Sequence, residues 1–136
     1  MKTAVTYYTK TGNTKKVANA IAAAAGCSAI PIADILDDTV DMLFIGGSIY
    51  GGVLDPSLVS FIGGLDSKKI KRAALFSTYI SEPKALVLMK DLLSKQGIPV
   101  TATFSCKGKF LLFNMKRPGD ADLEEAKKYA VSVIAK

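Results

Sequence analysis

The chain has 136 residues and a formal net charge of +6, and 49% of its residues are apolar. This length and composition predict one globular domain, residues 1–136, with a core of its own. No apolar run is long enough to span a membrane, and the N-terminus lacks the pattern of a signal peptide, so we expect a cytoplasmic protein.

Strand and helix patterns alternate along the chain. Apolar, β-prone runs predict strands at residues 2–8, 28–33, 42–46, 72–77 and 99–105. Helical spacing and capping residues predict helices over 13–25, from Asp55-Pro56, from Ser81 and Pro83 to Gly97, and from about Asp120 onward. Five strands alternating with four helices predict an α/β fold: a doubly wound five-stranded parallel sheet with helices on both faces.

The chain contains no histidine. Its absence excludes catalysis by a histidine base, zinc sites with histidine ligands and Cys–His nucleophiles. The two cysteines, Cys27 and Cys106, lack the spacing of a redox or metal pair. We interpret both as structural thiols in predicted strands.

Hydroxyl and glycine residues fill the turn between the first predicted strand and the first predicted helix. The turn reads Thr9-Lys10-Thr11-Gly12-Asn13-Thr14. Backbone N–H groups at a helix start have no intrahelical partner, and the helix dipole favours anions there. The spacings of the Walker loop and of the dinucleotide fingerprint are both absent. We therefore predict a phosphate cradle, the alternative being a capped turn that binds nothing.

The turn resembles the FMN phosphate loop of the flavodoxin family, and two later loops carry the same resemblance. The first is Gly46-Gly47-Ser48-Ile49-Tyr50-Gly51-Gly52, after the third predicted strand, and the second is Ser77-Thr78-Tyr79-Ile80-Ser81, after the fourth. The resemblance covers essentially the whole chain. It implies a flavodoxin-like sheet of strand order 2-1-3-4-5, with FMN bound beyond the C-terminal ends of strands one, three and four.

The resemblance also implies roles for single residues. Ser48 would lie near the ribityl chain, Tyr50 at the flavin face, and Gly51 where a peptide flips on reduction. For Tyr79, a core position at a strand end is the open alternative. The cofactor-binding residues implied are Thr9, Lys10, Thr11, Gly12, Asn13, Thr14, Ser48, Ile49, Tyr50, Gly51, Gly52, Ser77, Thr78, Tyr79, Ile80 and Ser81.

The chain departs from the family in its charge and aromatic residues. It has no tryptophan, and it is basic where family members are typically acidic. Residues 1–66 carry four Lys and Arg against six Asp and Glu, whereas residues 67–136 carry fourteen against six. Such asymmetry indicates a basic face, the commoner alternative for any single cluster being a solvated lysine-rich surface.

Residues 106–117 interleave basic and apolar side chains just after the fifth predicted strand. One interpretation is a docking rim for an acidic redox partner near Lys107, Lys109, Lys116 and Arg117. Another is peripheral contact with an anionic membrane or a lipophilic quinone. A third is that the apolar residues cover the sheet edge while the lysines stay solvated. We expect no nucleic-acid binding, because no aromatic stacking platform or groove-reading helix is apparent.

Three hypotheses for function follow. The first is an FMN-binding electron-transfer protein that shuttles electrons between redox partners and has no substrate of its own. The second is an FMN-dependent oxidoreductase that acts on a quinone or resembles the menaquinone-dependent protoporphyrinogen oxidases. The third is a flavin-free receiver-like or phosphate-binding module. A receiver needs an acidic cluster after the first strand, and Tyr7-Tyr8-Thr9 is not one.

Overall fold

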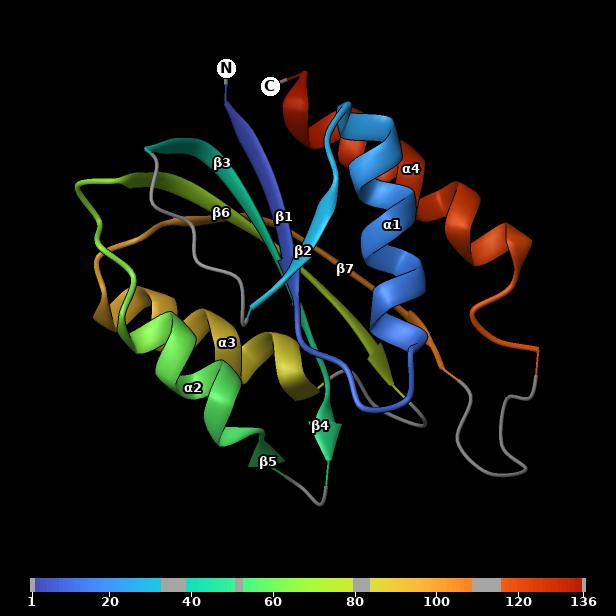
Figure 1. Ribbon diagram of the computed structural model, residues 1–136, viewed down its shortest axis with the longest axis horizontal. Helices are drawn as coiled ribbons and strands as arrows, with labels where there is room; N and C mark the ends of the chain where they lie inside the picture. The colour runs from blue at the N-terminus through green and yellow to red at the C-terminus, as the bar shows by residue number, and fades with distance from the viewer. Residues whose placement is uncertain (1, 33–38, 51–52, 80–83, 109–115, 136) are drawn as a thin grey trace.

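The computed structural model describes residues 2–32, 39–50, 53–79, 84–108 and 116–135 (Figure 1). The strands are β1 (Thr3–Tyr7), β2 (Ala29–Pro31), β3 (Val40–Gly47), β4 (Ile49–Tyr50), β5 (Val53–Leu54), β6 (Ile70–Tyr79) and β7 (Val100–Lys107). The helices are α1 (Asn13–Ala25), α2 (Pro56–Gly63), α3 (Lys84–Lys95) and α4 (Asp120–Ile134). Within these ranges no helix is long and apolar enough to cross a bilayer.

Five parallel strands form the main sheet in the order β2-β1-β3-β6-β7. Counted along the chain without the β4–β5 pair, this is 2-1-3-4-5, so the predicted fold and strand order are confirmed. The β4–β5 pair is a small antiparallel ladder that follows β3. The sequence predicts a cofactor-binding loop in this region, without strands. Two-residue strands are too short to give a periodic signal, which is why they were missed.

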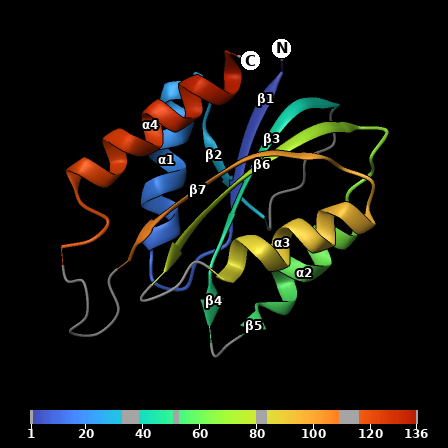
Figure 2. The same cartoon turned by 180° about the vertical axis from the view of Figure 1, so that it is seen from behind.

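Helices cover both faces of the sheet (Figures 1 and 2). One core packs α1 and α4 against alternate residues of β3, Met42 and Phe44. The other core packs α2 and α3 against the intervening residues, Leu43 and Ile45. All four are fully buried, which explains the continuous apolar run that predicted a central parallel strand.

Tyr129 of α4 joins its helix to the sheet through both an aromatic and a polar contact. Its ring stacks on Phe104 with centroids 5.4 Å apart and meets Phe44 edge-on at 5.9 Å. Its hydroxyl donates to the carbonyl oxygen of Leu75 at 2.8 Å. Burial raises the pKa of this phenol above its ordinary value. The hydroxyl thus stays neutral and hydrogen-bonded within the core.

Most predicted boundaries hold, with two corrections. Gly26 ends α1 in the left-handed region at φ 76°, and Asp55 caps α2 by accepting from the backbone N–H of Ser57 at 2.8 Å. Cys106 lies buried in β7 as expected. The placement of Cys27 in a strand is wrong, because its N–H bonds to the carbonyl of Ala22 in the turn that ends α1. Strand β6 also continues past residue 77 to Tyr79.

Glycine at position 46 allows β3 and β6 to pack closely. A Cβ built there would lie 2.1 Å from the ring of Phe76, its register partner on β6, and Phe76 is fully buried. The neighbouring Gly47 faces Leu58 of α2, where a Cβ would lie 2.4 Å from the leucine side chain. The absence of side chains at Gly46 and Gly47 therefore determines how closely β6 and α2 approach the end of β3.

We expect Gly46→Ala to lower the free energy of unfolding by about 1–3 kcal/mol, because the added methyl overpacks a filled core. Urea denaturation measures the change. The control is Gly63→Ala at the end of α2, where a Cβ meets nothing within 4 Å. Alanine favours helix over glycine, so this variant should be neutral or slightly more stable. Equal losses in the two variants would contradict the packing argument.

Candidate functional site

The candidate site lies at the C-terminal pole of the sheet, defined here by the strand ends Tyr7, Gly47, Tyr79 and Lys107. The turn that leads into α1 and the β4–β5 ladder lie at this pole (Figure 1). Three segments that the sequence analysis singled out therefore meet here: the turn 9–14, the start of the loop at Ser48, and Ser77–Tyr79. Gly51, Gly52, Ile80 and Ser81 lie outside the described residues.

Three hydroxyl groups, one from each of these segments, form a closed triangle. The side-chain oxygen of Thr14 lies 3.0 Å from that of Ser48 and 3.0 Å from that of Thr78, and the oxygens of Ser48 and Thr78 are 2.9 Å apart. All three residues are buried. Their bonds join the first turn of α1 to the ends of β3 and β6. We call this set the hydroxyl triangle.

Each hydroxyl carries one hydrogen, so three mutual bonds use every donor when each group donates once. In that arrangement the hydroxyl triangle has lone pairs to offer but no spare O–H. In the predicted phosphate cradle the Thr14 hydroxyl, like those of Thr9 and Thr11, would donate to the phosphate. In the structure the Thr14 oxygen instead lies 3.0 Å from the oxygens of both Ser48 and Thr78, and either atom of each pair can be the donor. Donation to an outside anion would require one edge of the triangle to open.

The turn that precedes α1 retains other donors. The hydroxyl oxygen of Thr9 accepts from the N–H of Gly12 at 2.9 Å, and that of Thr11 accepts from the N–H of Asn13 at 3.4 Å. Each hydroxyl still has its own hydrogen to donate. The backbone N–H groups of Thr14 and Lys15 have no acceptor within the described part of the chain.

The space and charge around this turn suit a phosphate group. Gly12 has φ 88°, and a Cβ there would meet nothing within 4 Å, so the backbone is open on that side. No acidic residue lies in the first turn of α1, which instead holds Lys15 and Lys16. Lysine at a helix start opposes the helix dipole, at a cost of about 0.3–1 kcal/mol each, whereas an anion would relieve that repulsion.

Asp55 connects the segment around the turn 9–14 to the start of α2. One carboxylate oxygen accepts from the hydroxyl of Tyr8 at 2.9 Å and lies 3.7 Å from the ammonium of Lys10. The other carries the cap bond from Ser57. These hydrogen bonds, the backbone one foremost, hold the pKa of Asp55 below its ordinary value. Sequence reasoning found the cap but not the bond to Tyr8, because the two residues are far apart along the chain.

Gly108 is a second residue that sequence reasoning missed. Its N–H donates to the carbonyl of Tyr79 at 2.8 Å, which continues the β6–β7 pairing. A Cβ at this position would lie 2.7 Å from the side-chain nitrogen of Asn13. Glycine thus lets the chain beyond β7 approach the start of α1. No local motif marks this contact, because it depends on how the strands are ordered in the sheet.

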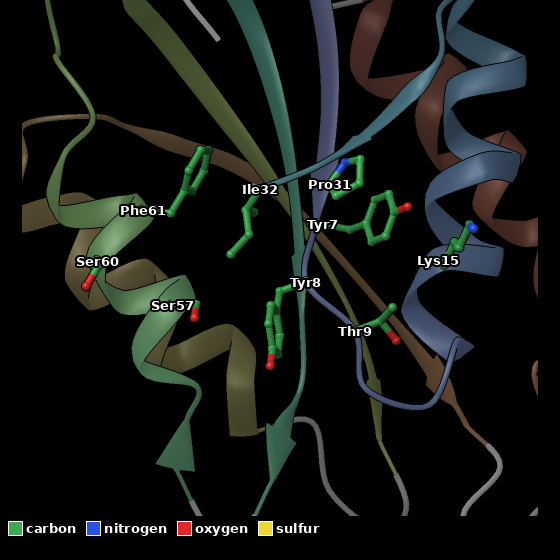
Figure 3. Close-up of a pocket in the computed structure, with 9 residues that line it drawn as sticks. All are labelled: Tyr7, Tyr8, Thr9, Lys15, Pro31, Ile32, Ser57, Ser60 and Phe61. Carbon is green, nitrogen blue, oxygen red and sulfur yellow. The ribbon is translucent and has the colours of Figure 1, made fainter. Parts of the chain in front are cut away.

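A cavity of about 690 Å³ adjoins the turn on the other side of β1. In Figure 3, Ser57, Ser60 and Phe61 of α2 lie across it from Tyr8 and Ile32. Thr9 and Lys15 also line it. Pro31 and Ile32 at the end of β2 line the cavity, whereas Ser48 follows β3 and Thr78 lies near the end of β6, on the opposite side of β1 in the sheet order. It is therefore distinct from the predicted flavin-ring position.

An ion pair fixes the segment that enters α4 at this pole. The guanidinium of Arg117 holds the carboxylate of Asp122 by two bonds, of 2.5 and 2.6 Å, and the N–H of Gly119 donates to the same carboxylate at 2.8 Å. The bonds to Arg117 hold the pKa of Asp122 below its ordinary value. Burial raises the pKa of the neighbouring Cys106 thiol to about 12.

We expect Thr78→Val to lower the free energy of unfolding by about 1–3 kcal/mol, because it leaves two buried hydroxyls with fewer partners while it keeps the side-chain shape. Chemical denaturation of the flavin-free protein measures the loss. Thr101→Val, the same change at an exposed position of β7, is the control and should stay within about 0.5 kcal/mol. A Thr78 variant as stable as the control would show that the hydroxyl triangle contributes nothing.

The Arg117–Asp122 pair should stabilise the fold in a pH-dependent manner. Because the folded pKa of Asp122 is lowered, its contribution is complete above the unfolded pKa of about 3.9 and is lost as pH falls through the folded value. Asp122→Asn should therefore destabilise the protein at about pH 7, and the difference from wild type should shrink at about pH 2. Thermal unfolding across this range measures it, with Asp91→Asn on the exposed side of α3 as control. A pH-independent difference would contradict the ion-pair origin.

Comparison with known proteins agrees with this fold. The flavodoxin domain family matches residues 4–115. No curated protein sequence gives a significant match. A flavodoxin from the domain Archaea superposes with a TM-score of 0.71 at 21% identity, covering 99% of this chain and 97% of that one. Oxidised flavodoxin 2 from Bacillus cereus superposes with a TM-score of 0.71 at 15% identity, covering 99% of each chain.

A flavoprotein from Lactobacillus acidophilus NCFM, solved in complex with FMN, is also similar. Its TM-score is 0.64 at 15% identity, and the match covers 76% of this chain and 92% of that one. At such identities the structures establish a shared fold. The family match extends over most of the sequence, from the second residue of β1 to beyond the end of β7. The protein belongs to the flavodoxin domain family.

Proposed function

We propose that the protein binds FMN at the C-terminal pole and carries electrons between redox proteins. The observation that carries the proposal is the turn before α1, whose unpartnered N–H groups and open glycine suit a phosphate. The family match and the FMN complex of the Lactobacillus flavoprotein support the choice of nucleotide. Bound FMN would supply a ring system that takes up electrons and gives them back.

The phosphate would be held by neutral donors. We assign this role to the backbone N–H groups of Thr14 and Lys15 and to the hydroxyls of Thr9 and Thr11. Gly12 leaves room for the anion, and Lys10 and Asn13 complete the turn. The hydroxyl triangle would hold this site in place, because it fixes the first turn of α1 against the ends of β3 and β6.

The flavin ring would lie between the segments that follow β3 and β6. Ile49 and Tyr50 belong to the β4–β5 ladder, and Tyr79 is half-buried at the end of β6. The assignment of Ser77, Gly51, Gly52, Ile80 and Ser81 rests on the resemblance to the family. No tryptophan is available to cover the ring.

The carboxylates at the pole favour a carrier over an enzyme that moves protons. Asp55 and Asp122 both have lowered pKa values and both hold hydrogen-bond partners. A general acid near neutral pH needs a raised pKa instead, so neither group suits that role. Within the described residues no cluster of potential metal ligands exists either. Electron transfer through a bound flavin requires no such group from the protein.

The alternative is an FMN-dependent oxidoreductase that acts on a quinone. The interleaved basic and apolar residues of the segment 106–117 favour it. Anaerobic mixing of the FMN-loaded protein with NAD(P)H and a soluble menaquinone analogue separates the two functions. A carrier should turn over negligibly without a partner reductase. Rapid turnover by the protein alone would establish the enzyme instead.

We expect Thr11→Asp to weaken FMN binding by roughly a hundredfold, about 3 kcal/mol, because it places a carboxylate beside the phosphate. Thr11 is exposed, so the substitution should leave the fold intact. Quenching of FMN fluorescence on binding measures the dissociation constant. Thr11→Asn, of similar size without charge, is the control and should retain most of the affinity. Equal affinity of the Asp variant and wild type would refute the phosphate cradle.

A further inference from the structure

We propose that the C-terminal pole is a docking face for an acidic redox protein. The inference rests on the proposed electron-carrier function and names the chemistry of the partner. The basic residues that the described part of the chain places at this pole are Lys10, Lys15, Lys16, Lys84, Lys107, Lys116 and Arg117.

Several of these lysines oppose the stability of the helices that carry them. Lys15 and Lys16 lie in the first turn of α1, and Lys84 is the first residue of α3. Neither first turn contains an acidic residue. Helix starts favour carboxylates, because the dipole and the unpaired N–H groups are positive there. The lysines at these two helix starts therefore do not stabilise their helices, which indicates that they serve another role.

The opposite end of the sheet is basic too, but its charges follow the ordinary rules. Lys95 occupies the last turn of α3, where the dipole favours a cation. Lys71 pairs with Asp41 at 3.0 Å. Lys68 lies within the turn that Asp66 begins, where its backbone N–H donates to the Asp66 carboxylate. The overall net charge thus does not by itself explain the arrangement at the C-terminal pole.

Of the carboxylates that the described residues place at the C-terminal pole, Asp55 and Asp122 are engaged within the fold, whereas Asp120 at the start of α4 is exposed. Asp55 caps α2 and pairs with Lys10, and Asp122 holds Arg117. Lys107 and Lys116 are exposed, and no carboxylate pairs with either of them within the described ranges. The positive field of the pole is therefore directed outward, towards an approaching partner.

Apolar surface accompanies this charge. Val53 of β5 and Val87 in the first turn of α3 are 60% and 64% exposed, and both belong to elements at the pole (Figure 2). Small apolar contacts within a charged rim are typical of a protein interface. Helices that bind a membrane surface instead use large residues such as Trp, Phe and Leu as anchors. Within the described residues these two valines favour a protein partner, with charge serving mainly to raise the association rate. The segment 106–117 also contains large apolar residues such as Phe110, so the test below includes anionic vesicles.

The first test uses poly-L-glutamate as the probe and nitrogen-15 NMR of the protein as the readout. Amide shifts should cluster at Lys84, Lys107 and Lys116 and be weak at Lys68 and Lys69. Equal shifts at both ends of the sheet would overturn the proposal, as would no shifts at all. Tight sedimentation with phosphatidylserine vesicles, together with weak poly-L-glutamate binding, would identify a membrane as the partner and would also overturn it. This test needs no bound flavin.

A pair of double variants supplies the matched control. K107E/K116E changes the C-terminal pole, and K68E/K69E makes the same charge change at the opposite end. Poly-L-glutamate affinity at low ionic strength should fall at least tenfold in the first variant and less than threefold in the second. Comparable losses in both variants would show that only net charge matters, and would overturn the assignment.

The reduced FMN-loaded protein provides a kinetic readout at the same pole. Its oxidation by ferricyanide, an anion, should slow as salt is added, whereas oxidation by hexaamminecobalt(III), a cation, should accelerate. K107E/K116E should weaken both salt effects more than K68E/K69E. Salt effects of the opposite sign would overturn the docking face. Failure to bind FMN would instead refute the proposed function and leave the poly-L-glutamate result to decide the docking face.

Discussion

The three buried hydroxyls of Thr14, Ser48 and Thr78 are the interaction on which the site depends. They belong to segments far apart along the chain, and their bonds of 2.9–3.0 Å fix the first turn of α1 against the ends of two central strands. A single misplaced member would leave the other two with one mutual bond and one unsatisfied donor in a dry environment, which is costly. The position of the turn 9–14 is thus determined by the sheet order as much as by its own sequence.

The apolar runs predicted a parallel sheet well, since β3 and β6 are buried on both faces and their runs are continuous. The strand order came from the resemblance of the three loops to the flavodoxin family. The turn 9–14 was also recognisable, because glycine and hydroxyl residues follow a strand and precede a helix. A linear pattern could not predict which residues contact one another across the C-terminal pole. The bond from Tyr8 to Asp55 and the contact of Gly108 with Asn13 follow from the tertiary arrangement, and neither leaves a periodic or local signal.

The role of Thr14 illustrates a related limit. From the sequence its hydroxyl looks like a phosphate donor, as do those of Thr9 and Thr11. In the structure Thr14 is fully buried and points into the hydroxyl triangle, whereas Thr11 is exposed. Residue type established the chemistry available in the turn, but burial decided which hydroxyls face outward. Tertiary contacts likewise determine which charges are available. The carboxylate of Asp55 bonds to Tyr8 and pairs with Lys10, whereas other lysines nearby are exposed.

The placement of Tyr129 has a spectroscopic consequence. Because the chain has no tryptophan, its ultraviolet emission comes from tyrosine alone. The phenol of Tyr129 is held between Phe104 and Phe44 and bonded to the backbone of β6. Tyr129 is one of five tyrosines, and its share of the emission and of the near-ultraviolet circular dichroism, obtained by comparison with Tyr129→Phe, reports the docking of α4 on the sheet. The protein carries an intrinsic probe of its C-terminal helix that needs no label.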